Sequence, residues 1–263
     1  MDILVCVKNV PEVAEADLEV TPDGSAIDTD DLVFAINEWD NFAVEEAVSL
    51  KEAHGGSVTV ITLGDDEAED ALRRALAMGA DEAIHLCDDL WDGADSAGVA
   101  RAIAAAIKDQ SFDLVLTGVQ ASDGGHAQTG VLLAHLMGLP HATMAIGLEL
   151  GGGKLIVTRE LEANTQEKVE LSLPAVVTVQ SGLNQPRYVS IMGIRKVRKK
   201  PVNLCDASEL GLTADQTGAE GSSVAWRRLS LPPTGDGAEF LQGSLEDVCQ
   251  QAADIIIEKG GLK

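Results

Sequence analysis

The sequence predicts an α/β fold: a doubly wound, mainly parallel sheet of the Rossmann-like type, with an antiparallel edge hairpin and a C-terminal arm. Over the first half of the chain, short apolar runs bounded by turn residues alternate with segments whose apolar residues recur at helical spacing. A glycine-rich turn then joins two strand-like segments, and the apolar pattern weakens beyond residue 200. We therefore expect an α/β domain at residues 1–200 and an arm at residues 201–263.

The alternation in the first half predicts the parallel sheet. The apolar runs expected to form buried strands are residues 3–7, 58–63, 82–86 and 114–117. The segments with helical spacing are residues 39–51, 66–78, 96–108 and 128–136. Strands and helices that alternate in this way form parallel sheets covered on both faces. The order resembles that of a doubly wound, adenine-nucleotide-binding domain.

After Pro140 the pattern changes to that of an antiparallel edge. Residues 145–150 and 155–160 flank the triplet Gly151, Gly152 and Gly153, which is a hairpin signal. A further strand is expected near residues 169–173. Residues 174–179 begin with a proline and continue with β-branched residues, which predicts another buried strand.

The arm is predicted from its composition. From about Pro201 the chain is rich in Gly, Ser, Thr, Asp and Pro, and only Trp226 and the amphipathic segment 245–259 offer obvious apolar anchors. A segment with so few apolar residues cannot easily bury itself, so we expect it to extend from the domain.

Composition excludes several classes of function. The chain has 263 residues, 45% of them hydrophobic, which is enough for a substantial core. It carries 43 acidic and 19 basic residues, a net charge of -24, which disfavours binding to nucleic acid or to an anionic membrane. No recognised nucleophile motif is present, and the five histidines lack metal-ligand spacing. We therefore expect no catalytic site and no metal site.

Cysteine usage and hydropathy bear on location. The four cysteines are widely spaced without a CxxC pair, which predicts reduced thiols rather than disulfides or zinc ligands. The opening MDILVCVK is too short and too charged for a signal peptide, and no apolar run approaches the ~18 residues that span a bilayer. We therefore expect a cytoplasmic protein that is not inserted into a membrane.

A candidate phosphate-binding loop occupies residues 118–130. It follows an expected strand, contains several glycines and enters an expected helix. Glycines let the backbone approach an anion, the first amides of the helix point toward it, and Ser122 and Thr129 add hydroxyl donors. The loop fits neither the P-loop nor the G-x-G-x-x-G pattern. From the residues alone, turn geometry without a ligand is an equal alternative.

Two other expected strand ends and one helix start converge on the same crevice. Cys6 and Leu63 would line it from the strands, because ligands of doubly wound sheets bind at the carboxyl ends of strands. Asn37, Trp39 and Asp40 open the first long helix. Asn37 is a natural helix cap, so it either caps the helix only or contacts a ligand as well.

Residues 174–200 carry a second candidate site. A buried strand leads into turn-forming residues and then into the chain's only dense basic run, residues 195–200. Leu183 lies among the turn formers, either tucked back into its own protein or offered to a partner. This stretch resembles the beta (small) subunit of electron transfer flavoproteins, whose signature places a proline-led strand, a leucine-bearing loop and N-[EQ]-P-R-Y in this order.

The resemblance implies a recognition loop at residues 181–191. In that family the leucine of the loop docks into an apolar pocket of a partner dehydrogenase. The residues that the resemblance assigns to docking here are Leu183, Asn184, Pro186, Arg187 and Tyr188.

The resemblance also implies AMP in the phosphate loop. The family's loop carries Q-A-x-D followed by Q-T-G, as this loop does. A bifurcating branch of the family places a second FAD there, but its loop usually continues to V-G-P where this chain has Thr129, Gly130 and Val131, which favours AMP. The residues expected to contact cofactor are Cys6, Asn37, Trp39, Asp40, Leu63, Gln120, Asp123, Gly124, Gly125, His126, Ala127, Gln128, Thr129 and Gly130.

Two further residues have alternative interpretations. Trp39 either sits against a flavin held by the partner subunit or belongs to the core. Glu160 matches the R-E of the family's R-E-x-E-G-G, which implies an interdomain role, although Ala163 and Asn164 replace the two glycines. A cross-strand ion pair is the alternative for Glu160.

The resemblance therefore implies an electron carrier subunit. FAD would be held mainly by an alpha subunit, around which the C-terminal arm of this chain would wrap. Electrons would come from a flavin-dependent dehydrogenase and pass to a downstream quinone oxidoreductase or another acceptor. Two alternatives are a bifurcating subunit that binds a second FAD and a stand-alone nucleotide-binding module of the universal-stress type.

Overall fold

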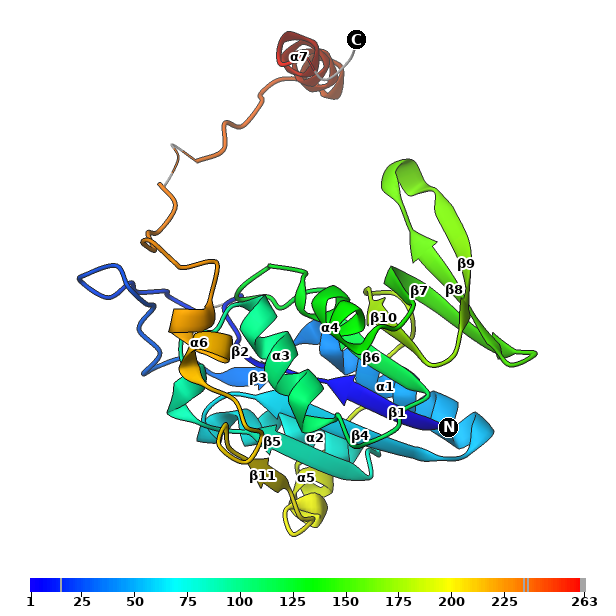
Figure 1. The fold of residues 1–263 in the computed structure, drawn as a ribbon. Coiled ribbons are helices and arrows are strands. Elements are labelled where there is room, and N and C mark those ends of the chain that lie inside the picture. Colours follow the sequence, from blue (N-terminus) through cyan, green and yellow to red (C-terminus); the bar gives the residue numbers. More distant parts are fainter. Residues whose placement is uncertain (15, 234, 236, 261–263) are drawn as a thin grey trace.

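The computed structural model describes residues 1–14, 16–233, 235 and 237–260. Its centre is a nine-stranded sheet in the order β11-β5-β4-β1-β6-β10-β7-β8-β9 (Figure 1). The strands of this sheet are β1 (Asp2–Cys6), β4 (Ser57–Leu63), β5 (Glu82–Leu86), β6 (Leu114–Gly118), β7 (His141–Gly151), β8 (Lys154–Glu160), β9 (Gln166–Ser172), β10 (Ala175–Val179) and β11 (Asn203–Cys205). A separate antiparallel pair consists of β2 (Asn9–Pro11) and β3 (Phe34–Ile36).

Helices cover both faces of the sheet. The helices are α1 (Glu38–His54), α2 (Glu69–Met78), α3 (Ser96–Ala106), α4 (Thr129–Met137), α5 (Ile191–Val197), α6 (Ala214–Thr217) and α7 (Leu245–Glu258). Short 3₁₀ turns form η1 (Asp66–Ala68), η2 (Asp89–Trp91), η3 (Glu162–Asn164) and η4 (Ala219–Gly221).

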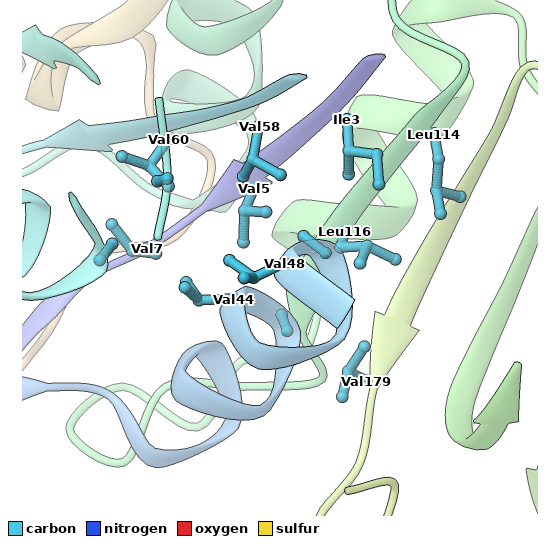
Figure 2. Packing of buried hydrophobic residues seen from close by; sticks show 14 of the residues in the cluster. Ile3, Val5, Val7, Val44, Val48, Val58, Val60, Leu114, Leu116 and Val179 are labelled. Carbon is cyan, nitrogen blue, oxygen red and sulfur yellow. The ribbon is translucent and has the colours of Figure 1, made fainter. Parts of the chain in front are cut away.

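The core is divided between the two faces by the alternation of side chains along β1. Ile3 and Val5 pack in the cluster that holds the buried residues of α1 and α2. Figure 2 shows them with Val44 and Val48 of α1. Leu4 and Cys6 point into the other cluster, which holds the buried residues of α3 and α4. Because β1 is buried on both faces, its sequence is a continuous apolar run rather than an alternating one.

The sheet has a topological switch point beside β1. The chain passes from β1 to β4 and β5 on one side, and then returns to β6 on the other side of β1. Both neighbours pair with β1 in parallel, so the carboxyl ends of β1, β4 and β6 meet at one edge. In doubly wound sheets this edge holds the ligand-binding crevice.

The predicted α/β fold is confirmed. The expected strands at 3–7, 58–63, 82–86 and 114–117 lie within one residue of β1, β4, β5 and β6, and the expected edge hairpin is formed by β7 and β8. The helix expected at 66–78 differs, because η1 forms its first turn and α2 begins at Glu69. The hydrophobic patterns in the sequence did not predict β2, β3, β11, α5 or α6.

The predicted arm begins with residues that belong to the domain. β11 pairs with β5 at the edge of the main sheet, and α6 packs against α3. Beyond them the chain leads away to α7, none of whose residues is buried (Figure 1). The boundary at residue 200 remains a prediction, and positions 234, 236 and 261–263 of the arm lie outside the described residues. Every helix in the described part of the chain is too short or too polar to cross a bilayer.

Candidate functional site

The loop between β6 and α4 lies at the switch point of the sheet. Gly118 ends β6, and Gly130, in the first turn of α4, is buried. A Cβ atom on Gly130 would come 2.5 Å from Oγ1 of Thr117 and 2.7 Å from Cγ2 of Thr178. Only glycine therefore lets the start of α4 pack this closely on β6 and β10. The nine-residue helix α4 consequently presents its first amides and the positive end of its dipole to the loop.

The middle of the loop is an exposed turn. The N–H of Gly125 donates to the carbonyl of Ala121 at 2.9 Å. Gly125 has φ +61° and Ala127 has φ +52°, and a positive φ is uncommon for alanine. Residues Asp123, Gly125, His126, Ala127 and Gln128 are exposed. The arrangement suits an anion bound against backbone amides from the solvent side.

Asn37 holds the loop from the start of α1. Its Nδ2 donates to the carbonyl of Gln120 at 2.8 Å, and its Oδ1 accepts from the N–H of Ser122 at 3.2 Å. Asn37 is buried, and its side chain makes no capping hydrogen bond to α1. The alternative that Asn37 acts only as a helix cap is therefore wrong, because the side chain is used to fix the loop.

Asp40 joins the ends of β1 and β6 beneath the loop. Its Oδ1 accepts from the N–H of Gly118 at 2.9 Å, and its Oδ2 accepts from the N–H of Lys8 at 2.8 Å. Burial raises the pKa of Asp40 to about 7, although these hydrogen bonds act in the opposite direction. Burial, with a smaller contribution from the charge of Asp40, also raises the pKa of the Cys6 thiol, so Cys6 stays protonated.

Sequence reasoning missed a cation beside the loop. Nζ of Lys8, two residues beyond the end of β1, forms an ion pair with Asp123. A cavity of about 140 Å³ opens next to it, at the carboxyl ends of β1 and β4. Its position directly after a buried strand was the available signal for Lys8. The cavity is lined by Lys8, Asn9, Phe34, Leu63, Gly64, Asp65, Glu67 and Ala68.

The predicted cofactor residues therefore gather around one edge of the sheet. Cys6, Leu63, Asn37 and Asp40 approach from strand ends and from α1, and residues 120–130 approach from the loop. A wider, open depression of about 590 Å³ lies at Arg101, Leu136, Leu212 and Gln216 and contains none of the predicted residues.

Trp39 connects this region with the second candidate site. Its Nε1 donates to Oε1 of Gln180 at 2.7 Å, and the same oxygen accepts from the N–H of Ser181, at the start of the candidate recognition loop. Trp39 is half-buried. Its indole is thus neither part of the core clusters nor freely exposed, and it links α1 to the loop that follows β10.

Two residues predicted to dock a partner are turned toward α1 instead. Nδ2 of Asn184 donates to the carbonyl of Phe42 at 3.1 Å and to Glu46 at 3.0 Å. Arg187 pairs with Glu45 at 2.9 Å and with Glu52 at 2.8 Å. Burial alone would raise the pKa of Glu45, but the hydrogen bonds and charge of Arg187 outweigh it and hold the pKa below its usual value. These side chains fix the loop on the domain.

The exposed apolar side chains of this stretch lie further along. Leu183 is half-buried and packs against the larger core cluster. Tyr188, Ile191 and Met192 are 90%, 72% and 61% exposed, and we call these three residues the docking face. Ser190 caps α5 by accepting from the N–H of Gly193 at 3.1 Å, which places Ile191 and Met192 at the start of the helix. Sequence reasoning assigned neither Ile191 nor Met192 to docking, although an apolar pair after a serine that can cap a helix was a usable signal.

Glu160 ends β8 opposite Gln166 of β9. Its neighbour makes a cross-strand ion pair, since Arg159 pairs with Glu167 at 2.9 Å and also donates to the carbonyl of Thr143 at 2.8 Å. Ala163 takes φ +55° in the turn that follows, where the family pattern has glycine. The turn therefore keeps a left-handed residue without the glycine.

Comparisons with known proteins identify the family of the chain. The Electron transfer flavoprotein domain family matches residues 25–210. The beta subunit of the electron transfer flavoprotein of Methylophilus methylotrophus is 37% identical over 265 residues, which covers 99% of this chain and all of the relative. The corresponding subunit of Bacillus subtilis is 38% identical over 258 residues, 97% of this chain and 96% of the relative. The chain belongs to the electron transfer flavoprotein beta-subunit family.

Membership in the electron transfer flavoprotein beta-subunit family gives the chain a role as part of an electron carrier rather than as an enzyme. A more specialised relative is subunit CarD of the caffeyl-CoA reductase-Etf complex of Acetobacterium woodii, which is 35% identical over 246 residues, 93% of each chain. The family therefore includes subunits of larger complexes.

Proposed function

We propose that this chain is the beta subunit of a heterodimeric electron transfer flavoprotein. FAD, held mainly by the alpha subunit, takes electrons from a flavin-dependent dehydrogenase and delivers them to a downstream quinone oxidoreductase or another acceptor. The observation that carries this proposal is the joint presence of a nucleotide-type loop and an exposed docking face on one domain, in a chain similar to beta subunits over nearly its full length. The four free cysteines are consistent with work in the cytoplasm.

The phosphate loop is proposed to hold AMP. Backbone amides at the start of α4, at Thr129, would bind the phosphate. Lys8 supplies a positive charge at the same edge, and Asn37 keeps the loop in the required shape. The outer side of the loop is exposed and leaves room for a bound group, whereas its two ends at Gly118 and Gly130 are held by close packing on the domain.

The docking face is proposed to bind the dehydrogenase. An exposed apolar cluster beside basic residues suits an apolar depression with an acidic rim. Leu183 remains a proposed anchor, but Ile191 offers the partner more of its side chain. With the loop fixed to α1 by Asn184 and Arg187, the dehydrogenase would be held in place while the flavin domain of the alpha subunit moves.

The remaining assignments concern the alpha subunit. The arm beyond α6 is proposed to wrap around it, since α7 leaves its apolar residues uncovered in this chain. Glu160 and Trp39 are proposed to lie near the flexing region and near the flavin, respectively. A bifurcating subunit with a second FAD is the alternative, and the similarity to the Etf component of a reductase complex favours testing it.

The test is a cofactor count. The chain is purified together with its coexpressed alpha subunit, the complex is denatured, and FAD and AMP are quantified per heterodimer. One FAD and one AMP are expected. Two FAD molecules without AMP would move the assignment to a bifurcating flavoprotein. A chain that carries nucleotide but binds no alpha subunit would contradict the heterodimer and favour a stand-alone nucleotide-binding module.

A further inference from the structure

The segment after η4 returns to the phosphate loop before it leaves the domain. The N–H of Ser223 donates to Oδ2 of Asp95 at 2.7 Å, and the N–H of Leu229 donates to the carbonyl of Gly24 at 2.8 Å. We call residues 223–229 the strap. The strap is therefore attached at both ends to the α/β domain, although it belongs to the predicted arm.

The strap contacts the phosphate loop between its two attachment points. The rings of Trp226 and His126 lie 5.6 Å apart between centroids, with an angle of 65° between their planes. This edge-to-face geometry is a favourable one for aromatic rings. His126 is exposed and lies in the turn that includes Gly125 and Ala127, so Trp226 touches the most exposed part of the loop.

The second attachment of the strap depends on a glycine at position 24. Gly24 has φ +73°, and a Cβ atom there would come 2.9 Å from Cγ of Arg228. A side chain at residue 24 would push Arg228 away, so the turn at Gly24 leaves room for the strap. Arg227 and Arg228 follow Trp226 directly and give the strap two positive charges, on a chain with a net charge of -24.

We propose that the strap, through the contact between Trp226 and His126, closes the outer side of the nucleotide site and slows the release of a bound adenine mononucleotide. This inference rests on the proposed function of the loop. An anion held by residues 123–128, of which all but the half-buried Gly124 are exposed, would otherwise face solvent on the outer side of this domain. The strap leads into the rest of the arm, which is proposed to bind the alpha subunit. The contact between Trp226 and His126 would therefore make nucleotide release depend on how the arm is bound.

The experiment measures the release of bound AMP from the purified heterodimer by exchange with isotopically labelled AMP. Trp226→Ala and His126→Ala should each speed release by about two- to tenfold, the effect of losing one aromatic pair. The double variant should be no faster than the faster single variant, because both remove the same contact. Leu231→Ala is the matched control: Leu231 is 55% exposed and lies just past the second attachment, so it should leave release unchanged.

The outcomes separate this inference from the proposed function. If wild-type and Trp226→Ala complexes carry AMP and release it at equal rates, the strap does not retain nucleotide and the inference is wrong while the AMP site stands. A wild-type complex without nucleotide overturns both. If Trp226→Ala does not assemble, His126→Ala decides, because it removes the same contact from the loop rather than from the arm. Additive effects of the two variants would also contradict the proposal.

Discussion

At the scale of single residues, the candidate nucleotide site depends on buried polar side chains that bind backbone. Asn37 and Asp40 are both buried, and each makes two hydrogen bonds to the segments that surround the site. A buried polar group without partners is costly, so such groups occur where their partners must be held in place. Here the partners are the ends of β1 and β6 and the loop that follows β6.

Removal of the Asn37 side chain should loosen the loop. Asn37→Ala leaves the carbonyl of Gln120 and the N–H of Ser122 without these partners, and a typical hydrogen bond contributes about 0.5–1.5 kcal/mol to stability. We expect AMP occupancy of the purified complex to fall severalfold, measured by chromatography after denaturation. Glu38→Ala, one position away and exposed, is the control. Full occupancy in Asn37→Ala would show that the loop does not need this support.

The raised pKa of Asp40 predicts that the stability of the fold depends on pH. Its pKa is about 7 in the folded chain against an ordinary value of 3.8. Between these values the folded chain holds a proton that the unfolded chain has released, so this residue makes the fold less stable as pH rises from about 4 to about 7. Above pH 7 its effect is constant.

Asp40→Asn removes that dependence. The free energy of unfolding of the variant, relative to wild type, should rise as pH increases from 4.5 to 7.5, because asparagine stays neutral throughout. Denaturant unfolding of the complex at several pH values measures the difference. Asp81, whose pKa is lowered, titrates below this window, so Asp81→Asn should show no such trend. A pH-independent difference for Asp40→Asn would mean that Asp40 is already ionised at pH 4.5.

The sequence could predict these positions but not their tasks. Asn37 and Asp40 were found because they open a helix next to a crevice, and their use in holding the loop depends on a long-range approach of residues about 80 positions apart. The position of Lys8 after a buried strand was a signal for the site edge, but it does not show which residue Lys8 contacts, because the pairing of β1 with β6 brings it to Asp123.

At the scale of elements, α5 changes the interpretation of the docking region. The sequence drew attention to a lone leucine in a turn-rich loop, but Leu183 is partly covered by the core, whereas α5 begins with two exposed apolar residues. The helix was not predicted because its seven residues are too few to show a helical period. The basic residues near its end also interrupt the apolar pattern. The strands β2, β3 and β11 were not predicted for the same reason, since they are also very short.

An experiment can decide whether Ile191 or Leu183 makes the main contact with the dehydrogenase. Ile191→Ala removes an exposed contact and should raise the KM for the donor dehydrogenase about five- to thirtyfold, the effect of losing 1–2 kcal/mol of contact. Flavin content should stay the same. Leu183→Ala should instead lower thermal stability more than docking. Steady-state reduction by the dehydrogenase and thermal unfolding are measured for both, and an unchanged KM in Ile191→Ala would remove the docking face from the proposal.

Arg187 should act by positioning the loop rather than by touching the partner. Arg187→Lys keeps the positive charge but loses the planar fork that pairs with Glu45 and Glu52, so the loop should become mobile. We expect faster hydrogen exchange in residues 181–191 and a weaker docking of the dehydrogenase, with the cofactor count unaltered. Arg198→Lys makes the same exchange at an exposed residue of the basic run and is the matched control. Unchanged exchange in Arg187→Lys would contradict this role.

At the scale of the whole molecule, α1 lies between the two candidate sites. Its first residues hold the phosphate loop, and residues 42–52 hold the candidate recognition loop. The relative placement of the two candidate sites is thus set by one helix. This placement could not be derived from the sequence, because it depends on β10 lying next to β6, which brings its following loop over α1. Composition alone shows the weaker apolar pattern beyond residue 200, but not that β11 and α6 of this segment join the domain, and the division at residue 200 stays a prediction.

The exposed apolar face of α7 predicts where the alpha subunit binds. Leu245, Val248, Ala252 and Ile255 recur at helical spacing along one face of α7, and no residue of α7 is buried in this chain. Such a face is stable in water only when another surface covers it. Ile255→Asp would place a charge in that contact, so we expect the heterodimer to dissociate at least about tenfold more readily.

The measurement is the dissociation constant of the two subunits, obtained by native mass spectrometry over a dilution series. Gln250→Asp adds the same charge to a polar position of α7 and should leave the constant within about twofold of wild type. Because α7 is outside the sheet, the α/β domain of the Ile255→Asp variant should keep its circular dichroism and its AMP. Equal affinity of both variants for the alpha subunit would mean that this face of α7 is not the contact, and that the arm binds through its extended part instead.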